Sequence, residues 1–169
     1  MSNLDAALNY AHSQRPQFGA ALRELAAIPS ISAQSERNAD MLRAAEFVAD
    51  YCRNQVGLTR VEIMPTAGHP LVYGEWLGAP GKPTVLIYGH YDVQPAEMED
   101  GWNSDPFTPT EKDNNLYARG ASDMKGQVML TLAALASLAK QGGLPINVKV
   151  MIEGEEEIGS PNLIEFIQQ

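Results

Sequence analysis

The sequence is poor in cysteine and in long hydrophobic runs. Cys52 is the only cysteine among 169 residues, so the chain forms no internal disulfide bond, and one thiol is typical of a protein from a reducing compartment. No apolar run approaches the roughly 20 residues that a transmembrane helix needs. The opening residues, MSNLDAALNYAHSQ, lack the basic and then apolar order of a secretory signal peptide. These absences predict a cytoplasmic protein with no membrane partner.

Basic residues are also few. Twelve Lys and Arg residues face 21 Asp and Glu residues, which gives a formal net charge of -9. A nucleic-acid interface needs clustered Lys and Arg, so we expect no nucleic-acid partner. The 44% hydrophobic and 20% charged fractions are those of a globular protein with a real core, and the length fits about one domain.

Several well-known catalytic motifs are missing. The sequence has no HExxH, no pair of CxxC motifs and no GxSxG. The stretch GAPGKP is unlike a phosphate-binding loop because its glycines are too close and Pro83 stands where Ser or Thr is required. Ser30, Ser32 and Ser35 have no base that the sequence identifies. A phosphate-handling Mg²⁺ protein is therefore disfavoured.

Helical and strand patterns alternate along the chain. The patterns predict helices at 3–28 (one or two, the second starting at Pro16), 36–57 with Gly57 as its cap, 126–143, and from Pro161 onward. They predict strands at 60–64, 70–77, 84–89 and 146–154. Polar interruptions suggest that 70–77 is an edge or half-exposed strand, whereas 84–89 has the apolar pattern of a strand covered on both faces. This alternation predicts parallel β-α-β units in a layered α/β domain.

His90 and Asp92 follow directly on the apolar run 85–87. Parallel α/β sheets bind ligands at the carboxyl ends of their strands. In an extended chain, residues two apart lie on the same side, so the Asp92 carboxylate can hold one imidazole nitrogen while the other faces a metal. The alternative is a loop histidine with an aspartate nearby by chance.

Asp123 lies at the start of the predicted helix 126–143. A helix N-cap is the ordinary explanation for an aspartate at this point. The same position keeps the carboxylate ionised through the helix dipole, as a carboxylate that bridges two cations must be. The residues alone leave both interpretations open.

Four acidic residues, Glu153, Glu155, Glu156 and Glu157, lie at the end of the predicted strand 146–154. They repel one another unless they are solvated or close to cations. A solvated acidic loop is one interpretation, but the run starts at the end of a strand and so lies at the same edge as His90. One imidazole and several carboxylates suit Zn²⁺, Mn²⁺ or Co²⁺, and two ions that share a carboxylate make a hydrolytic centre.

Four segments resemble the M20 metallopeptidases, the aminoacylase and carboxypeptidase group, in order and approximate spacing. They are YGHYDVQPAE, GWNSDPFTP, LYARGASDMKG and EGEEEIGS. The first and third most resemble the dipeptidase branch, which includes carnosinase-like and cytosolic nonspecific dipeptidases. The resemblance implies a three-layer αβα sandwich with a mostly parallel sheet. It also implies that residues 1–169 are the N-terminal part of the catalytic domain, without its C-terminal part and without the lid through which the family dimerises.

The resemblance also implies a role for each motif residue. His90 would bind one metal ion, with Asp92 behind it to orient the ring. Asp123 would bridge two ions, Glu156 would be the general base, and Glu157 would bind the other ion. The peptide bond after Asp123 is expected to be cis. The cofactors would be two divalent ions, Zn²⁺ first and Mn²⁺ or Co²⁺ as alternatives.

The implied function is metal-dependent hydrolysis of the peptide bond of dipeptides or short peptides by a homodimer. An N-acyl amino acid amidohydrolase and a non-catalytic assembly module that kept the fold are the alternatives. His90, Asp123 and Glu157 are only three ligand residues for two ions, whereas a catalytic zinc usually takes three protein ligands. We therefore expect the 169-residue chain by itself to bind metal poorly and to hydrolyse nothing.

Overall fold

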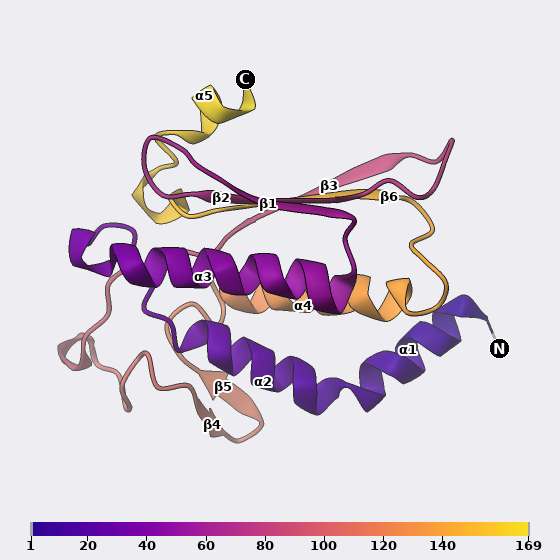
Figure 1. Ribbon diagram of the computed structural model, residues 1–169. Coiled ribbons are helices and arrows are strands. Elements are labelled where there is room, and N and C mark those ends of the chain that lie inside the picture. The colour runs from indigo at the N-terminus through magenta and orange to yellow at the C-terminus, as the bar shows by residue number, and fades with distance from the viewer. Residues whose placement is uncertain (1, 169) are drawn as a thin grey trace.

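The computed structural model describes residues 2–168 as alternating helices and strands (Figure 1). The α-helices are α1 (Asn3–Ser13), α2 (Arg15–Ala26), α3 (Asn38–Tyr51), α4 (Lys125–Ala139) and α5 (Leu163–Ile167). The strands are β1 (Arg60–Met64), β2 (Leu71–Trp76), β3 (Thr84–His90), β4 (Thr110–Lys112), β5 (Asn115–Tyr117) and β6 (Asn147–Glu153).

The helix boundaries follow local signals in the sequence. The predicted helical stretch 3–28 is two helices, and Pro16 lies in the first turn of α2, where its missing N–H costs nothing. A π-helical turn extends α3 to Val56, and Gly57 then takes the left-handed conformation, with φ 79°, that ends the helix. The predicted cap at Gly57 is confirmed. Pro161, expected in the first turn of the last helix, instead precedes α5.

The main sheet is mixed, so the expectation of a mostly parallel sheet is wrong for the described residues. Its strand order is β1-β2-β6-β3, and only β3 and β6 pair in parallel. A parallel pair needs a long crossover, usually a helix, and α4 supplies one between β3 and β6. Only six residues join β1 to β2, which favours an antiparallel pair. The α/β class itself is confirmed.

Two strands lie at other places in the sheet of residues 2–168 than their own sequences suggest. The stretch expected at an edge or in a half-exposed position, β2, lies inside the sheet between β1 and β6, and Tyr73, Glu75 and Trp76 on it are half-buried. Within residues 2–168, the stretch expected to be covered on both faces, β3, lies at the edge of the sheet, and Leu86 and Tyr88 on it are 56% and 44% exposed. The polar residues of β2 do not reveal its place in the sheet, because the sequence of a strand does not determine which strands pair with it.

The helices form two successive layers on one face of the sheet (Figure 1). The helices α3 and α4 lie directly against it, and α1 and α2 lie on the far side of α4. Among the described residues, only α5 lies beyond the opposite face. Of the expected αβα arrangement, residues 2–168 form the sheet and the helix layer of α3 and α4 that covers one of its faces.

The core lies between this helix layer and the sheet. Val48 of α3, Leu132 of α4 and Val150 of β6 are essentially inaccessible to solvent. Each side chain of this size contributes about 1.5–3 kcal/mol when it is fully buried. Val148 and Ile152 share the buried face of β6 with Val150, as the period of two in a strand requires.

Cys52 is part of this core and should be chemically inert. Its side chain is fully buried, and this burial raises the pKa of its thiol to about 12. We expect iodoacetamide at pH 8 to leave Cys52 unmodified in the folded chain and to modify it in guanidinium chloride, as peptide mass mapping would show. Between pH 9 and 12 only the unfolded thiol loses its proton, so the free energy of unfolding should fall as the pH rises. Rapid native labelling at pH 8 would contradict this packing.

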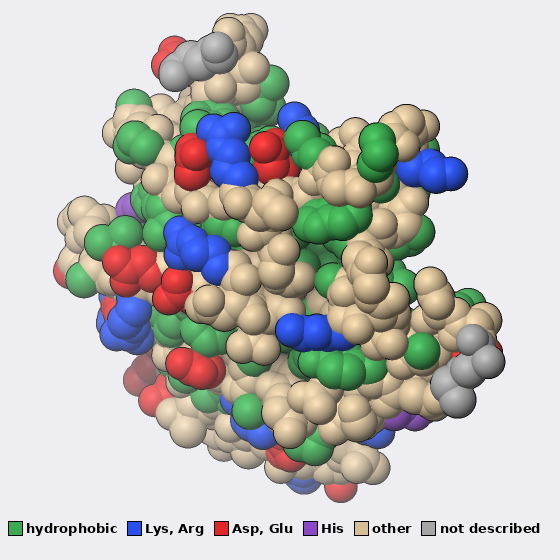
Figure 2. Space-filling model, turned by 45° about the vertical axis from the view of Figure 1, so that its right-hand side comes forward, with side chains coloured by type: hydrophobic (Ala, Val, Ile, Leu, Met, Phe, Trp, Pro, Cys, Tyr) green, Lys and Arg blue, Asp and Glu red, His purple; other side chains and the backbone are tan. Residues whose placement is uncertain are grey.

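Basic side chains are scattered on the visible face of the molecule (Figure 2). On the face shown in Figure 2, Lys and Arg side chains are separated by acidic, hydrophobic and neutral groups and form no continuous basic patch. None of the helices within residues 2–168 has both the length and the hydropathy needed to cross a bilayer.

Candidate active site

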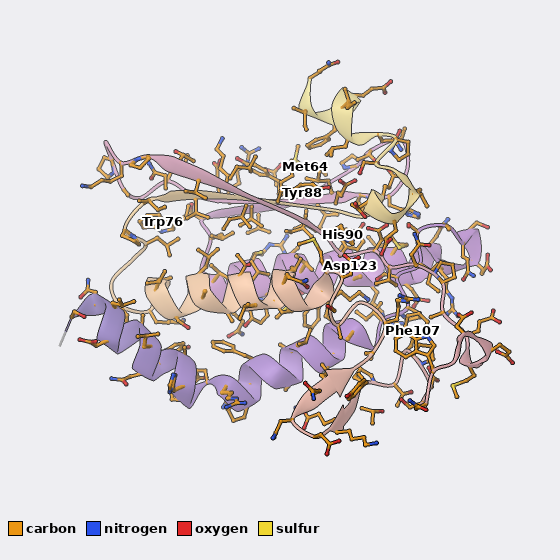
Figure 3. The ribbon with its side chains drawn as sticks, turned by 180° about the vertical axis from the view of Figure 1, so that it is seen from behind. Met64, Trp76, Tyr88, His90, Phe107 and Asp123 are labelled. Carbon is orange, nitrogen blue, oxygen red and sulfur yellow. The ribbon has the colours of Figure 1, made fainter. Side chains whose placement is uncertain are left out.

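Three segments that are distant in sequence meet at one end of the sheet. His90 ends β3 and is aligned with Glu153, which ends β6. Because these two strands are parallel, their carboxyl ends lie at the same edge. Asp123, just before α4, lies next to His90 (Figure 3). The sequence placed these residues at one edge, and the structure brings them together there.

The His90 imidazole lies between carboxylates on both sides. Its Nδ1 lies 3.1 Å from the backbone oxygen of Asp92 and 3.3 Å from Asp92 Oδ1. Its Nε2 lies 3.2 Å from Asp123 Oδ1 and 3.7 Å from Glu156 Oε2. Burial lowers the pKa of His90, but the hydrogen bonds and charge of Asp92 and the charge of Glu156 outweigh it and raise that pKa to about 9. The ring therefore sits in a strongly cation-attracting environment.

Asp92 contacts both His90 and the backbone of the acidic turn. Its carboxylate is fully buried and accepts a hydrogen bond from the Ser32 hydroxyl at 2.7 Å. It also accepts the backbone N–H groups of Glu156 and Glu157 at 3.3 and 3.0 Å. One carboxylate thus orients the imidazole and fixes the backbone of the two glutamates predicted to act as base and metal ligand.

Asp123 is not a helix N-cap, so the ordinary explanation for it is wrong. The N-cap of α4 is Met124, and no side chain caps this end. The Asp123 side chain is instead 79% exposed and directed at His90. The Asp123–Met124 peptide bond is cis, as the resemblance implied. The carboxylate is therefore free of helix hydrogen bonds and available to a ligand at the rim.

The acidic run is not a uniformly solvated loop. Glu153 and Glu155 are 4% and 5% exposed, and Asn162 donates to both carboxylate oxygens of Glu155 at 3.1 and 2.8 Å. Glu156 is directed at His90, whereas the Glu157 carboxylate accepts a hydrogen bond from Gln94 Nε2 at 2.9 Å. The structure therefore gathers His90, Asp123 and Glu156 closely, with Glu157 bound to a neighbouring side chain.

Three supporting residues have no signal in the sequence. Ser32 and Gln94 bind Asp92 and Glu157 from positions 60 and 63 residues away. Lys125 is fully buried, and its Nζ donates to the backbone oxygens of Leu25 and Ile28 at 3.1 and 2.6 Å. Burial lowers the pKa of Lys125 to about 7. No spacing rule connects such partners, so only the fold reveals them.

The types of ligand atom at the site suit a divalent cation. Two carboxylates converge on one imidazole nitrogen, and among residues 2–168 neither Asp123 nor Glu156 forms an ion pair with Lys or Arg. Imidazole and carboxylate together suit Zn²⁺ or Mn²⁺. Within the same residues, no three His, Cys, Asp or Glu side chains form a group that could hold a metal ion by itself. The chemistry of the site fits a metal, and the coordination is incomplete.

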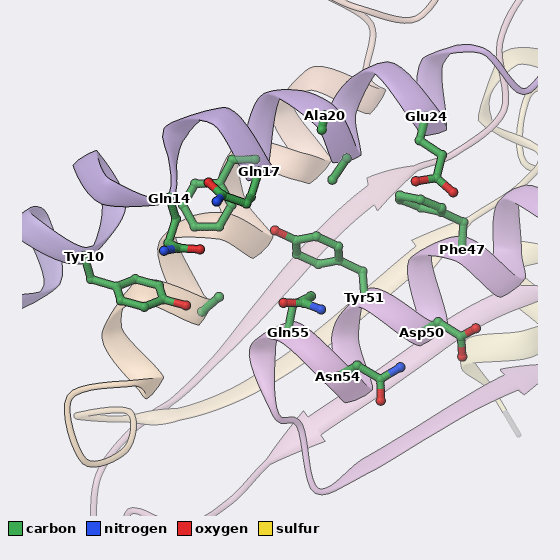
Figure 4. Close-up of a pocket in the computed structure, with 13 residues that line it drawn as sticks. Tyr10, Gln14, Gln17, Ala20, Glu24, Phe47, Asp50, Tyr51, Asn54 and Gln55 are labelled. Carbon is green, nitrogen blue, oxygen red and sulfur yellow. The ribbon is translucent and has the colours of Figure 1, made fainter.

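Two hollows lie away from these residues. One, of about 530 Å³, is lined by Tyr10, Phe47 and Tyr51 between the first two helices and α3 (Figure 4). The other, of about 1120 Å³, lies between α1, α2, the β4–β5 hairpin and α4. Neither is lined by a residue that the sequence predicted as functional. The candidate site is instead an open rim, because Asp123 and Glu156 face solvent.

Comparisons with known proteins identify similar sequences and structures. Residues 86–169 match the model of peptidase family M20/M25/M40. The sequence is 37% identical over 180 residues to a β-Ala-His dipeptidase of Rattus norvegicus, covering 98% of this chain and 36% of the rat protein. It is 32% identical over 176 residues to a Cys-Gly metallodipeptidase of Schizosaccharomyces pombe, covering 98% of this chain and 37% of that protein.

Solved structures show the same relationship. The crystal structure of human carnosine dipeptidase 1 matches with a TM-score of 0.90 and 35% identity, covering 99% of this chain and 38% of the human one. The chain thus spans a little over a third of the length of these relatives. Residues 86–169 thus match part of peptidase family M20/M25/M40, and the whole chain is homologous to the β-Ala-His and Cys-Gly dipeptidases.

Proposed function

We propose that the protein containing this chain hydrolyses the peptide bond of dipeptides with the help of divalent metal ions. The observation that carries the proposal is the convergence of Asp123 and Glu156 on Nε2 of a buried histidine. The dipeptidases among its relatives support dipeptides as the substrate class. Residues 1–169 would be the N-terminal part of the catalytic domain, in a homodimer formed through a lid outside this segment.

We assign the metal ligands to His90, Asp123 and Glu157, and Asp123 would be the ligand shared by two ions. When bound, the ions, Zn²⁺ by preference, polarise the scissile carbonyl group and lower the pKa of water. Asp92 holds His90 Nδ1, so Nε2 would be the nitrogen that binds a metal ion. The Glu157 carboxylate accepts a hydrogen bond from Gln94 Nε2 at 2.9 Å and would be the ligand of the second ion.

Glu156 acts as the general base. Its side chain is 46% exposed, and its carboxylate faces the rim where substrate and water arrive. It takes a proton from the attacking water and delivers that proton to the nitrogen of the leaving amine. Asp92 fixes the backbone N–H of Glu156, so the base is held at the rim while its side chain stays accessible.

The proposal is tested on the protein expressed from its complete gene, freed of metal with a chelator and then given Zn²⁺, Mn²⁺ or Co²⁺. We expect hydrolysis of β-Ala-His or Cys-Gly that is lost with the chelator and restored by metal. Chain 1–169 alone is the matched control, and it should show weak metal binding and no turnover because its coordination is incomplete.

Two outcomes would contradict the proposed function. Faster hydrolysis of N-acetyl amino acids than of every dipeptide would favour an amidohydrolase. No metal-dependent turnover of either class of substrate would favour a non-catalytic module that kept the fold.

A further inference from the structure

A second buried carboxylate, Glu153, lies beside the candidate site and is not explained by metal binding or proton transfer. It is 4% exposed and ends β6, three residues before Glu156. Its backbone oxygen accepts a hydrogen bond from Tyr91 N at 2.8 Å, which continues the pairing of β6 with β3 past His90. A buried carboxylate is costly unless it is well hydrogen-bonded, so its partners indicate what it does.

Two hydroxyl groups converge on the same oxygen of this carboxylate. Tyr88, two residues before His90 in β3, donates its phenolic O–H to Glu153 Oε1. Ser160 donates its hydroxyl to the same Oε1 at 2.9 Å. Burial and the Glu153 carboxylate raise the pKa of Tyr88, which keeps the phenol protonated as a donor. Hydrogen bonds from O–H groups to a carboxylate are among the stronger ones in proteins.

Ser160 has a backbone conformation that favours glycine. Its φ is 51°, in the left-handed region that L-residues rarely adopt. The neighbouring Gly159, with φ 90°, shows that the chain uses glycine here where no side chain is needed. A serine at 160 makes sense if its hydroxyl is required, and in this structure the hydroxyl binds Glu153.

Glu153 and Ser160 bracket the turn that carries Glu156 and Glu157. We infer that Glu153 is a positioning residue: with Tyr88 and Ser160 it fastens both ends of this turn to β3, while Asp92 fixes the backbone N–H groups at its centre. His90 lies on the same strand, β3, as Tyr88. The turn that carries Glu156 and Glu157 is therefore held at a fixed distance from His90. The catalytic part of this inference rests on the proposed function, whereas the structural part does not.

The test uses Tyr88→Phe and Ser160→Gly in the protein expressed from its complete gene. Each variant removes one hydroxyl from Glu153, and Ser160→Gly also relaxes the left-handed backbone. We expect amide hydrogen exchange across residues 154–160 to become faster in both variants without metal. We also expect kcat for the dipeptide to fall roughly tenfold, because small misplacements of catalytic groups are costly, with little change in KM.

The melting temperature separates positioning from simple stability. Ser160→Gly loses one hydrogen bond to Glu153 but also relieves the left-handed backbone strain, so Tm should change little while kcat falls, which a merely structural role for the serine would not produce. The matched control is Asp113→Gly in the β4–β5 hairpin, also at φ 51°, which should leave exchange at 154–160 and kcat unchanged.

Unchanged exchange at 154–160 in both variants overturns the inference, as does unchanged kcat in an active enzyme or a fall in Tm that parallels kcat. If the wild-type protein hydrolyses no peptide, the proposed function fails. Hydrogen exchange then still decides whether Glu153 holds the turn.

Discussion

Glu156→Gln is expected to lower kcat for dipeptide hydrolysis by about 10²–10⁴-fold in the protein expressed from its complete gene. Glutamine has nearly the same shape as glutamate but cannot accept a proton at neutral pH. The backbone N–H of residue 156 remains bound to Asp92, so the turn should keep its place. Steady-state kinetics with a saturating dipeptide gives kcat, and a chelator competition gives the dissociation constant of Zn²⁺.

The Zn²⁺ dissociation constant should change little, because Glu156 is assigned as a base and not as a ligand. Glu46→Gln is a matched control, since Glu46 is an exposed residue of α3, and it should retain full activity. A Glu156→Gln variant that keeps most of its turnover would show that another group acts as the base. A variant that loses zinc together with activity would make residue 156 a ligand.

Asp92→Ala should weaken zinc binding by about 10–100-fold and abolish most activity. The substitution removes the carboxylate that orients His90 Nδ1. It also leaves the Ser32 hydroxyl and the N–H groups of Glu156 and Glu157 without their acceptor. Each donor left unpaired costs about 1–3 kcal/mol, so the free energy of unfolding should fall as well. Zinc competition and denaturant unfolding measure the two effects.

Ser32→Ala separates these contributions. It removes one donor to Asp92 but keeps the carboxylate next to His90, so zinc affinity should change far less than in Asp92→Ala. Equal losses of zinc affinity in the two variants would mean that packing around Asp92, and not its charge and hydrogen bonds to His90, controls the site. An Asp92→Ala protein with wild-type zinc affinity would remove Asp92 from the proposed mechanism.

The sequence was informative wherever a signal is local. Pro16 and Gly57 marked helix ends correctly because proline geometry and the left-handed cap depend on one residue. The strand ends carrying His90 and Glu153 were also located, because apolar runs followed by polar residues mark the edge of a sheet. Their approach to each other then follows from the parallel pairing of β3 and β6.

The errors arose where the outcome depends on a distant partner. Polar residues in β2 suggest an edge or a half-exposed strand; β2 is half-buried, but β6, more than 70 residues later, pairs with it and places it inside the sheet. Asp123 is of a residue type that often caps helices, but the N-cap of α4 is Met124. The Asp123 carboxylate instead lies next to His90 Nε2. The sequence alone gives Glu155 no role among its acidic neighbours. In the structure, Asn162 donates hydrogen bonds to its carboxylate.

A zinc-containing crystal structure of the protein expressed from its complete gene tests the proposed site most directly. Anomalous scattering at the zinc edge should place two ions at the carboxyl edge of the sheet, one of them about 2.0–2.1 Å from His90 Nε2. Asp123 should contact both ions, and Glu157 should contact the second. Zinc ions bound elsewhere, with His90, Asp123 and Glu157 left without metal, would contradict the assignment of this edge as the catalytic centre.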